Sequence, residues 1–194
     1  MSHILLRMYF RQARNWLTFC MARNIEIKAH VCDLVALSKR VAEVATTGPV
    51  EIHQDDTFFR CASGRLKLRT FSDTDGELIF YRRTDQHGPK ESSYIRTPTQ
   101  HPDLLRQSLT LAYGQAGRVV KRRTLYFVGR SRVHLDKVVD LGDFMELEVV
   151  LQGDEPSEAS VADAHTLMAQ LGIKPSYLID AAYVDLLAQR AAVA

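Results

Sequence analysis

The chain has 194 residues, of which 46% are hydrophobic and 25% are charged, and its formal net charge is +2. This length is enough for one domain with a sizeable core, and the net charge gives no reason to expect a nucleic-acid-binding protein. The three cysteines form no closely spaced pair and no apolar run could span a bilayer, so we expect no disulfide framework, zinc site or membrane segment. A reducing compartment such as the cytoplasm fits this cysteine usage.

Residues 1–20 differ in character from the rest of the chain. They contain three arginines, and no acidic residue precedes Glu26. An arginine-bearing, acid-free stretch is typical of a mitochondrial presequence, and the alternative is a dispensable extension ahead of a functional start at Met21. The fold is therefore expected within residues 21–194, as a single domain.

The spacing of apolar residues predicts the elements that follow. Short segments with alternating apolar and polar residues predict strands, in chain order at 24–29, 50–61, 64–71, 77–83, 92–97, 118–127, 132–139 and 144–151. Helical spacing predicts helices at 33–46, 102–113, 157–171 and 176–190, and a polar loop covers 85–91. Because strands and helices do not alternate, the pattern indicates an α+β protein with an antiparallel sheet or barrel.

Charged residues occupy alternate positions in several of these strands. In the stretch GRLKLRTF at 64–71, Arg65, Lys67 and Arg69 share one face and two leucines share the other. One such strand alone is typical of a solvent-facing sheet. Here the pattern recurs with both signs, and the partner faces are strongly apolar. A barrel whose apolar face points outward to helices would place every charged row in its lumen, where eight strands leave room for a small ligand.

The mixture of charges on these rows has a chemical meaning. The cations are Lys28, Arg65, Lys67, Arg69, Arg83, Lys121, Arg123 and Arg132, and the anions are Glu26, Asp136, Glu146 and Glu148. An excess of arginine and lysine suits a polyphosphate, because guanidinium groups bind phosphate oxygens in a bidentate way. Carboxylates beside them would repel phosphate unless they hold a divalent metal, and Mg²⁺ is usually bound by a few carboxylates and substrate phosphates. The rows therefore indicate a metal–polyphosphate site.

Eight short motifs in order resemble the CYTH superfamily of triphosphate tunnel metalloenzymes, most closely its class IV adenylyl cyclase (CyaB-like) branch. The chain reads NIEIK at 24–28 where the family has E-x-E-x-K, and continues with QDDTFF, GRLKLR, ELIFYRR, KRR, VHLDKV, LGDF and ELE. The resemblance implies an eight-stranded antiparallel tunnel that binds a triphosphate and Mg²⁺ or Mn²⁺. It implies phosphate ligands among the cations above and metal ligands among the anions. Arg132 is included because it shares a face with Asp136.

Three functions remain open. We favour hydrolysis of a triphosphate such as tripolyphosphate, ATP or thiamine triphosphate, because hydrolysis needs no pocket that orients a nucleotide. The alternatives are a class IV adenylyl cyclase, which converts ATP to cyclic AMP and pyrophosphate, and a non-catalytic polyphosphate-binding module. Asn24 replaces the first glutamate of the motif, which would weaken metal binding. For His134, a plain hydrogen-bonded histidine and a functional role are equally good interpretations. Nucleic-acid binding is disfavoured because no aromatic residues interleave with the basic rows.

Overall fold

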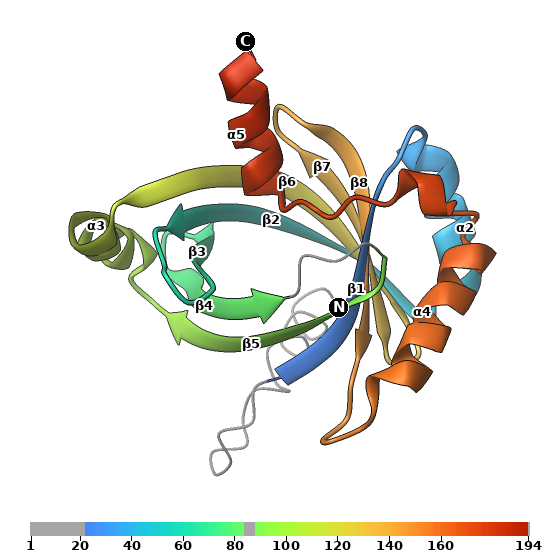
Figure 1. The fold of residues 1–194 in the computed structure, drawn as a ribbon. Helices are drawn as coiled ribbons and strands as arrows, with labels where there is room; N and C mark the ends of the chain where they lie inside the picture. The colour runs from blue at the N-terminus through green and yellow to red at the C-terminus, as the bar shows by residue number, and fades with distance from the viewer. Residues whose placement is uncertain (1–21, 84–87, 194) are drawn as a thin grey trace.

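Eight strands form a closed barrel in this computed structural model, which describes residues 22–83 and 88–193. The expectations for residues 1–20, and for part of the loop at 85–91, lie outside the described residues. All neighbouring strands are antiparallel, in the order β1-β5-β4-β3-β2-β6-β7-β8 (Figure 1). The strands are β1 (Ala22–His30), β2 (Thr47–Phe59), β3 (Arg65–Ser72), β4 (Asp75–Arg83), β5 (Lys90–Thr99), β6 (Gln115–Val128), β7 (Ser131–Val138) and β8 (Gly142–Val150). The predicted α+β barrel is confirmed.

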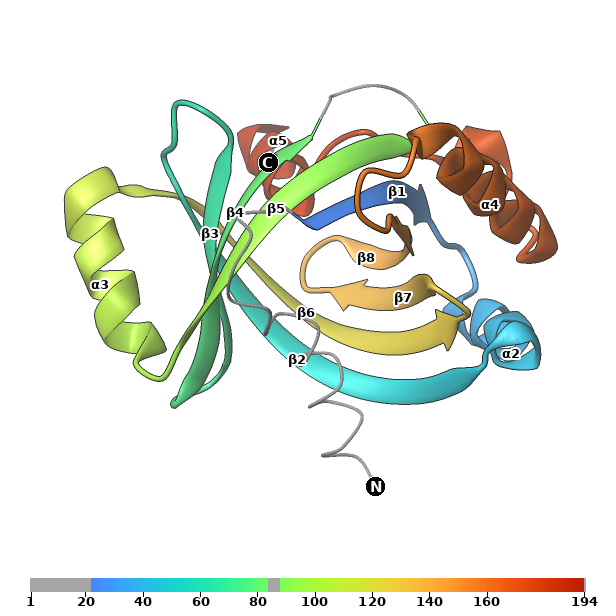
Figure 2. The ribbon, with the colours of Figure 1, turned by 90° about the horizontal axis from the view of Figure 1, so that it is seen from below.

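Helices flank the barrel on two sides and at one end. They are α2 (Leu34–Val44), α3 (Pro102–Tyr113), α4 (Ser157–Gln170) and α5 (Tyr183–Val193), with a short 3-10 turn at Pro175–Tyr177. Helix α3 lies on the opposite side of the barrel from α2 and α4 (Figures 1 and 2). Asp33 caps α2, because its Oδ1 accepts a hydrogen bond of 2.9 Å from the Ala36 amide. None of the helices in the described part of the chain combines the length and apolarity needed to cross a lipid bilayer.

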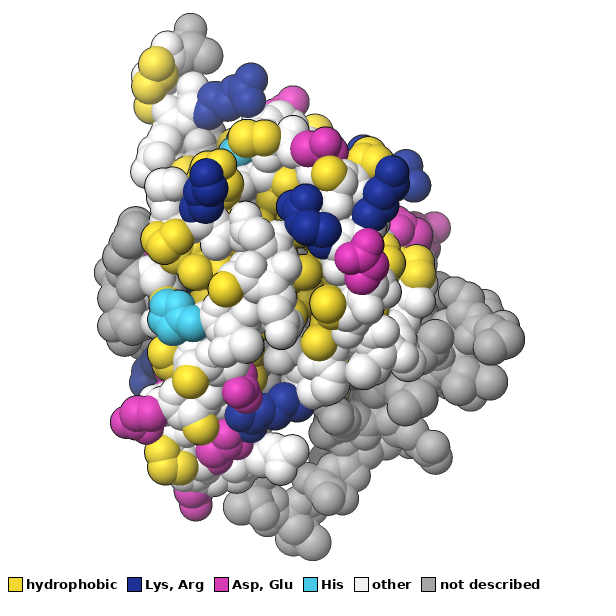
Figure 3. Space-filling model, turned by 90° about the vertical axis from the view of Figure 1, so that its right-hand side faces the viewer, with side chains coloured by type: hydrophobic (Ala, Val, Ile, Leu, Met, Phe, Trp, Pro, Cys, Tyr) yellow, Lys and Arg dark blue, Asp and Glu magenta, His cyan; other side chains and the backbone are white. Residues whose placement is uncertain are grey.

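The largest apolar core lies between the outer face of the barrel and helices α2 and α4. Ile27 of β1 and Leu147 of β8 are 1% and 0% exposed, and they pack with Leu37 of α2 and Leu167 of α4. Because side chains alternate along a strand, this outward packing turns the charged rows of β1 and β8 into the lumen. On the side of the molecule that carries α2 and α4, basic and acidic side chains are interspersed among apolar ones (Figure 3).

The charged part of the lumen lies between two apolar clusters. Along the inward face of β6, Lys121 and Arg123 are preceded by Val119 and followed by Leu125. Leu125 packs with residues of β2 in one cluster, and Val119 packs with residues of α5 and its neighbours in another. Charges therefore do not fill the whole lumen. They form a band between the two apolar clusters.

Helix α5 begins later than predicted. The expected helix at 176–190 starts only at Tyr183, because Ile179 donates its backbone amide to the Lys28 carbonyl at 2.9 Å and Leu178 bridges Ala29. Strand β5 pairs with β1 only as far as Glu26, so β1 would otherwise leave backbone groups unpaired beyond that point. The segment that contains Leu178 and Ile179 pairs with this edge of β1, and α5 then begins at the end of the lumen.

Candidate functional site in the barrel lumen

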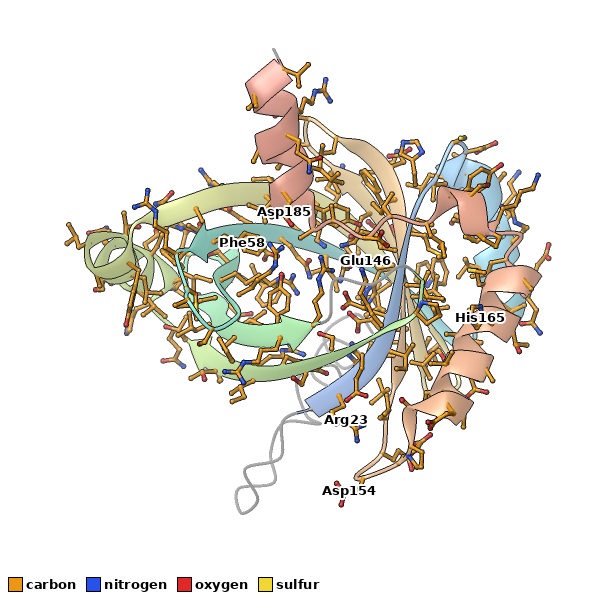
Figure 4. The ribbon with its side chains drawn as sticks, in the orientation of Figure 1. Arg23, Phe58, Glu146, Asp154, His165 and Asp185 are labelled. Atoms are coloured by element: carbon orange, nitrogen blue, oxygen red, sulfur yellow. The ribbon has the colours of Figure 1, made fainter. Side chains whose placement is uncertain are left out.

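A cavity inside the barrel collects most of the predicted site residues. Ten of the twelve line it, namely Glu26, Lys28, Lys67, Arg69, Arg83, Lys121, Arg123, Arg132, Glu146 and Glu148. Figure 4 shows Glu146 inside the ring of strands, whereas Asp154 and His165 lie outside it. Basic side chains outnumber acidic ones in the lining by eight to four, since Arg96 and Asp56 also contribute. The cavity therefore favours an anionic ligand.

The other two predicted residues, Arg65 and Asp136, lie beside the cavity and not in its lining. Arg65 is 28% exposed and forms a bidentate pair with Asp185 of α5, with Nη2 2.7 Å from Oδ2. Asp136 is completely buried, behind the cations of β6. Arg65 is thus placed to contact a ligand only at the α5 end, and Asp136 can act on a ligand only through its neighbours.

Asp136 holds the two cations of β6 in place. Its carboxylate accepts hydrogen bonds from Arg123 at 2.7 and 2.6 Å, from Lys121 at 2.9 Å and from the Tyr183 hydroxyl at 3.1 Å. Burial alone would raise the pKa of Asp136, but Arg123 and Lys121 hold it well below its usual range. An ionised Asp136 therefore fixes the position of both cations. These are the contacts that the structure gives Asp136, and its role as a metal ligand stays a prediction.

Asp56 performs the same task for the cations of β3, and the sequence interpretation missed it. Its oxygens accept hydrogen bonds from Lys67 at 2.8 Å and from Arg69 at 2.7 Å twice. Burial alone would raise the pKa of Asp56, but Arg69 and Lys67 lower it far below its usual range. Asp55, its neighbour in the chain, faces outward and pairs with Arg118. The QDDTFF motif shows that one of two adjacent aspartates must face the lumen, but not which one.

Lys67 is a lumen cation whose protonation changes near neutral pH. Burial, followed by repulsion from Arg69, lowers its pKa to about 7, although the Asp56 carboxylate acts in the opposite direction. The Lys67 ammonium also lies 5.7 Å from the centre of the Tyr81 ring. A bound anion would place a further negative charge beside Lys67 and so favour its protonated form.

An acidic corner lies where β7 and β8 face β1. Glu146 pairs with Lys28 at 2.8 Å and also with Arg123, while Glu148 pairs with Arg132 at 3.2 Å. Burial alone would raise the pKa of Glu148, but His134, Arg132 and Arg123 lower it to about 2, so the carboxylate is ionised. Glu26, directly opposite Glu148 in the register of β1 and β8, pairs with Arg83 at 2.8 Å.

His134 belongs to the same corner. It is 1% exposed, and burial followed by repulsion from Arg123 lowers its pKa to about 3, so the ring is neutral. His134, Glu146 and Glu148 each present one metal-ligating atom, and these atoms lie within 4.8 Å of one another. Two ionised carboxylates and a neutral imidazole are a donor set that fits a divalent cation.

Tyr183, at the start of α5, reaches into the lumen. Its hydroxyl donates to Asp136, and the ammonium groups of Lys28 and Lys121 lie 4.2 and 4.9 Å from the centre of its ring. Burial raises the pKa of Tyr183 well above its usual value, so the hydroxyl keeps its proton. Spacing could not predict this position of Tyr183, because residues 176–190 have the spacing of an unbroken helix.

A less charged sector of the cavity lies along β1 and β5. Asn24 is 3% exposed and sits opposite Ser92 in the register of the two strands, and both line the cavity. The Asn24 Oδ1 has no hydrogen-bond partner among the described residues. Asn24 thus contributes an uncharged side chain with an unpaired acceptor oxygen to the lining of this part of the cavity.

Comparison with known proteins gives a consistent result. The family model for the CYTH domain matches residues 22–183. Adenylate cyclase CyaB of Aeromonas hydrophila is 26% identical over 178 residues, which cover 86% of this chain and 89% of the relative. The PH1012 protein of Pyrococcus horikoshii superposes with a TM-score of 0.73 at 22% identity, covering 84% of this chain and 98% of its own. HpAC1 of Hippeastrum superposes with a TM-score of 0.60 at 14% identity, covering 89% and 96%.

Proposed function

The chain belongs to the CYTH domain family, and from this premise we propose that it is an enzyme that cleaves a triphosphate-containing small molecule in its barrel lumen with the help of Mg²⁺ or Mn²⁺. One observation carries the proposal. The cavity is lined by eight basic side chains and four acidic ones, held between apolar clusters in a closed barrel. Such a band of fixed charges suits an elongated polyanion better than any neutral ligand.

The proposed phosphate ligands come from all sides of the lumen. They are Lys28, Lys67, Arg69, Arg83, Lys121, Arg123 and Arg132, with Arg65 at the α5 end. Asp136 engages Arg123 through Nε and Nη2, which leaves Nη1 for a ligand. Because Asp56 and Asp136 already fix four of these cations, little reorganisation is needed when charge develops on the transferred phosphoryl group. Pre-placed cations of this kind contribute most of the catalysis in phosphoryl transfer.

The carboxylates of Glu146 and Glu148 would hold the metal, with Glu26 beside Glu148 on the neighbouring strand β1. When bound, a divalent ion neutralises phosphate charge and lowers the pKa of a coordinated water. The lysine and arginine partners of these glutamates keep them ionised and oriented. Asn24, at the first motif position, contributes no charge to this set.

Hydrolysis is the reaction we favour. Water would attack the terminal phosphorus, the bond to the bridging oxygen would break, and orthophosphate and a diphosphate would leave. Attack by the ribose 3′-hydroxyl of ATP on the α-phosphorus, with release of pyrophosphate, is the second candidate. The name of the Aeromonas relative favours that alternative. Hydrolysis needs no pocket that orients a nucleoside, and the lining is dominated by charged side chains.

Product analysis tests the proposal directly. The purified chain is incubated with Mg²⁺ or Mn²⁺ and tripolyphosphate, ATP or thiamine triphosphate, and the products are separated by ion-exchange chromatography. Orthophosphate with a diphosphate supports the hydrolase, and cyclic AMP with pyrophosphate supports the cyclase. Binding without turnover would identify a non-catalytic module and overturn the proposal.

A matched pair of variants ties turnover to the lumen. Glu148→Gln removes a proposed metal-binding charge inside the barrel, and we expect turnover to fall by about 100-fold. Glu91→Gln removes a carboxylate that pairs with Arg23 at the far end of β1, outside the cavity lining. Its activity should match that of the wild type, and equal losses in the two variants would contradict the site.

A further inference from the structure

His134 is a buried polar side chain whose hydrogen bonds are not made. The ring is 1% exposed, and neither Nδ1 nor Nε2 has a hydrogen-bond partner among the described residues. Buried polar groups in folded proteins are nearly always paired, so each exception calls for a ligand, an ion or a water. His134 is not itself in the cavity lining, and Leu125, which lies opposite it on β6, offers no polar side chain. Glu146 and Glu148, which do line the cavity, are its neighbours on β8.

The nearest groups are carboxylates at a distance that a hydrogen bond does not explain. His134 Nδ1 lies 3.9 Å from Glu146 Oε2 and 3.8 Å from Glu148 Oε1. A hydrogen bond from an imidazole would be about 2.7–3.2 Å long. Two ligand atoms that share one metal ion, each about 2.1 Å from it, can be up to about 4.2 Å apart. The separations are thus too long for direct contact and short enough for a shared ion.

The two carboxylates are held in this geometry by other residues. Lys28 binds Glu146 Oε1 at 2.8 Å, and Arg132 binds Glu148 Oε2 at 3.2 Å. In Glu148 the oxygen bound by arginine is the one turned away from His134, so the other oxygen is left facing the ring. In Glu146 the oxygen that faces His134 is also bound by Arg123, so an ion at this corner would share that oxygen with the guanidinium. The neighbouring cations therefore hold both carboxylates in place.

We propose that His134 is a nitrogen ligand of the lumen metal, and that with Glu146 and Glu148 it forms a mixed nitrogen–oxygen site that prefers a first-row transition ion to Mg²⁺. Mg²⁺ favours oxygen ligands, whereas imidazole suits Co²⁺, Ni²⁺ and Zn²⁺ and binds them with affinities that rise along the series from Mn²⁺ to Ni²⁺. The inference rests on the proposed function for the presence of a metal in the lumen, but it names the ligand and the class of ion.

Metal binding without any triphosphate tests this inference. Mn²⁺, Co²⁺, Ni²⁺ and Mg²⁺ are titrated calorimetrically into the full chain and into His134→Phe, which keeps the size of the ring but has no ligand atom. We expect affinity to rise from Mg²⁺ to Mn²⁺, Co²⁺ and Ni²⁺ in the wild type. In His134→Phe the transition ions should bind at least about ten-fold more weakly, while Mg²⁺ should change little. His134→Gln is measured beside it, and thermal unfolding of each variant checks that the barrel is intact.

Electron spin echo modulation of bound Mn²⁺ gives a readout that does not depend on affinity. The wild type should show coupling to nitrogen that changes when the histidines are labelled with ¹⁵N, and both His134 variants should lose it. His53→Phe, at an exposed histidine on the outer face of β2, should keep it.

Absence of nitrogen coupling in the wild type, or unchanged metal selectivity in both His134 variants, would overturn the inference. The proposed function would still stand if Mg²⁺ supported cleavage. Conversely, nitrogen-coupled Mn²⁺ in a chain that neither binds nor cleaves a triphosphate would support the metal site and overturn the proposed function.

Discussion

Lys67 and Arg69 share one buried carboxylate, and this sharing determines what a substitution of either residue does. Asp56 is 2% exposed and receives charge-assisted hydrogen bonds from both cations. Removal of one partner from a buried ion pair typically costs about 3–5 kcal/mol, because a charge is left without compensation. We therefore expect Arg69→Ala to lower the free energy of unfolding by about 3 kcal/mol, measured by urea denaturation.

Two further variants make this result specific. The double variant Asp56→Ala/Arg69→Ala removes the stranded carboxylate and should be more stable than Arg69→Ala alone. Arg118→Ala breaks a bidentate pair with Asp55 on the outside of the barrel, where the arginine is 59% exposed, and it should cost less than about 1 kcal/mol. If Arg69→Ala proved as mild as Arg118→Ala, the role assigned to Asp56 would be wrong.

The lowered pKa of Lys67 predicts that polyphosphate binding depends on pH. In the free protein this pKa is about 7, and a bound triphosphate would raise it by adding negative charge. Binding then takes up a proton, so affinity should fall as the pH rises above about 7, by at most about ten-fold per pH unit. Titration calorimetry at pH 8 in two buffers of different ionisation enthalpy measures this uptake. Lys67→Arg, which stays charged, should show less uptake, and equal uptake in both proteins would refute the assignment.

Alternation along strands predicted which residues share a face, and the structure gives the same faces. The apolar residues between Glu26 and Lys28, and between Glu146 and Glu148, pack outward against helices, so the charges face the lumen. Alternation could not tell whether Asp55 or Asp56 faces inward, because that depends on the register of β2 against β3. Nor could it show that Asp136 binds the cations of β6, since contacts across strands decide this.

At the scale of elements, local spacing predicted the strands and three of the four helices closely. The exception is α5, and its cause is not local. Leu178 and Ile179 have helical spacing with the residues that follow, but they pair with β1 beyond the point where β5 ends. An unpaired edge on a strand more than 140 residues away in the chain cannot be seen in the spacing of the segment itself. The later start of α5 matters for the site, because it places Tyr183 in the lumen.

The spacing of residues also could not predict the apolar clusters at both ends of the charged band. Val119 and Leu125 lie on the inward face of β6 together with Lys121 and Arg123, so the strand alternates correctly but the lumen changes character along its length. Only the stagger of neighbouring strands shows that these apolar residues meet others at the same height. Asp56 and Asp136 are buried in this band, where attraction between opposite charges is stronger than at the surface.

At the scale of the whole molecule, the barrel couples ligand binding to folding. Every strand contributes to the closed sheet, and cations from several strands line one cavity. A polyanion that binds these cations therefore stabilises the folded state and not the unfolded state. Tripolyphosphate at 100 times its dissociation constant should stabilise the fold by about 2.7 kcal/mol. For a chain of this size that corresponds to a rise in Tm of about 5–10 °C. Orthophosphate at the same concentration should give a smaller rise, because it cannot span the band.

Thermal unfolding of two lysine variants locates this stabilisation. Lys121→Met removes a cation that is 3% exposed inside the barrel, and Lys137→Met removes an exposed one from the outer face of β7. We expect tripolyphosphate to raise the Tm of Lys137→Met as much as that of the wild type, and that of Lys121→Met by clearly less. Because buried charges are screened weakly, part of the shift should persist at 0.5 M salt, unlike that of a surface site. Equal shifts in both variants, or loss of the shift in salt, would place the polyphosphate on the outside of the barrel.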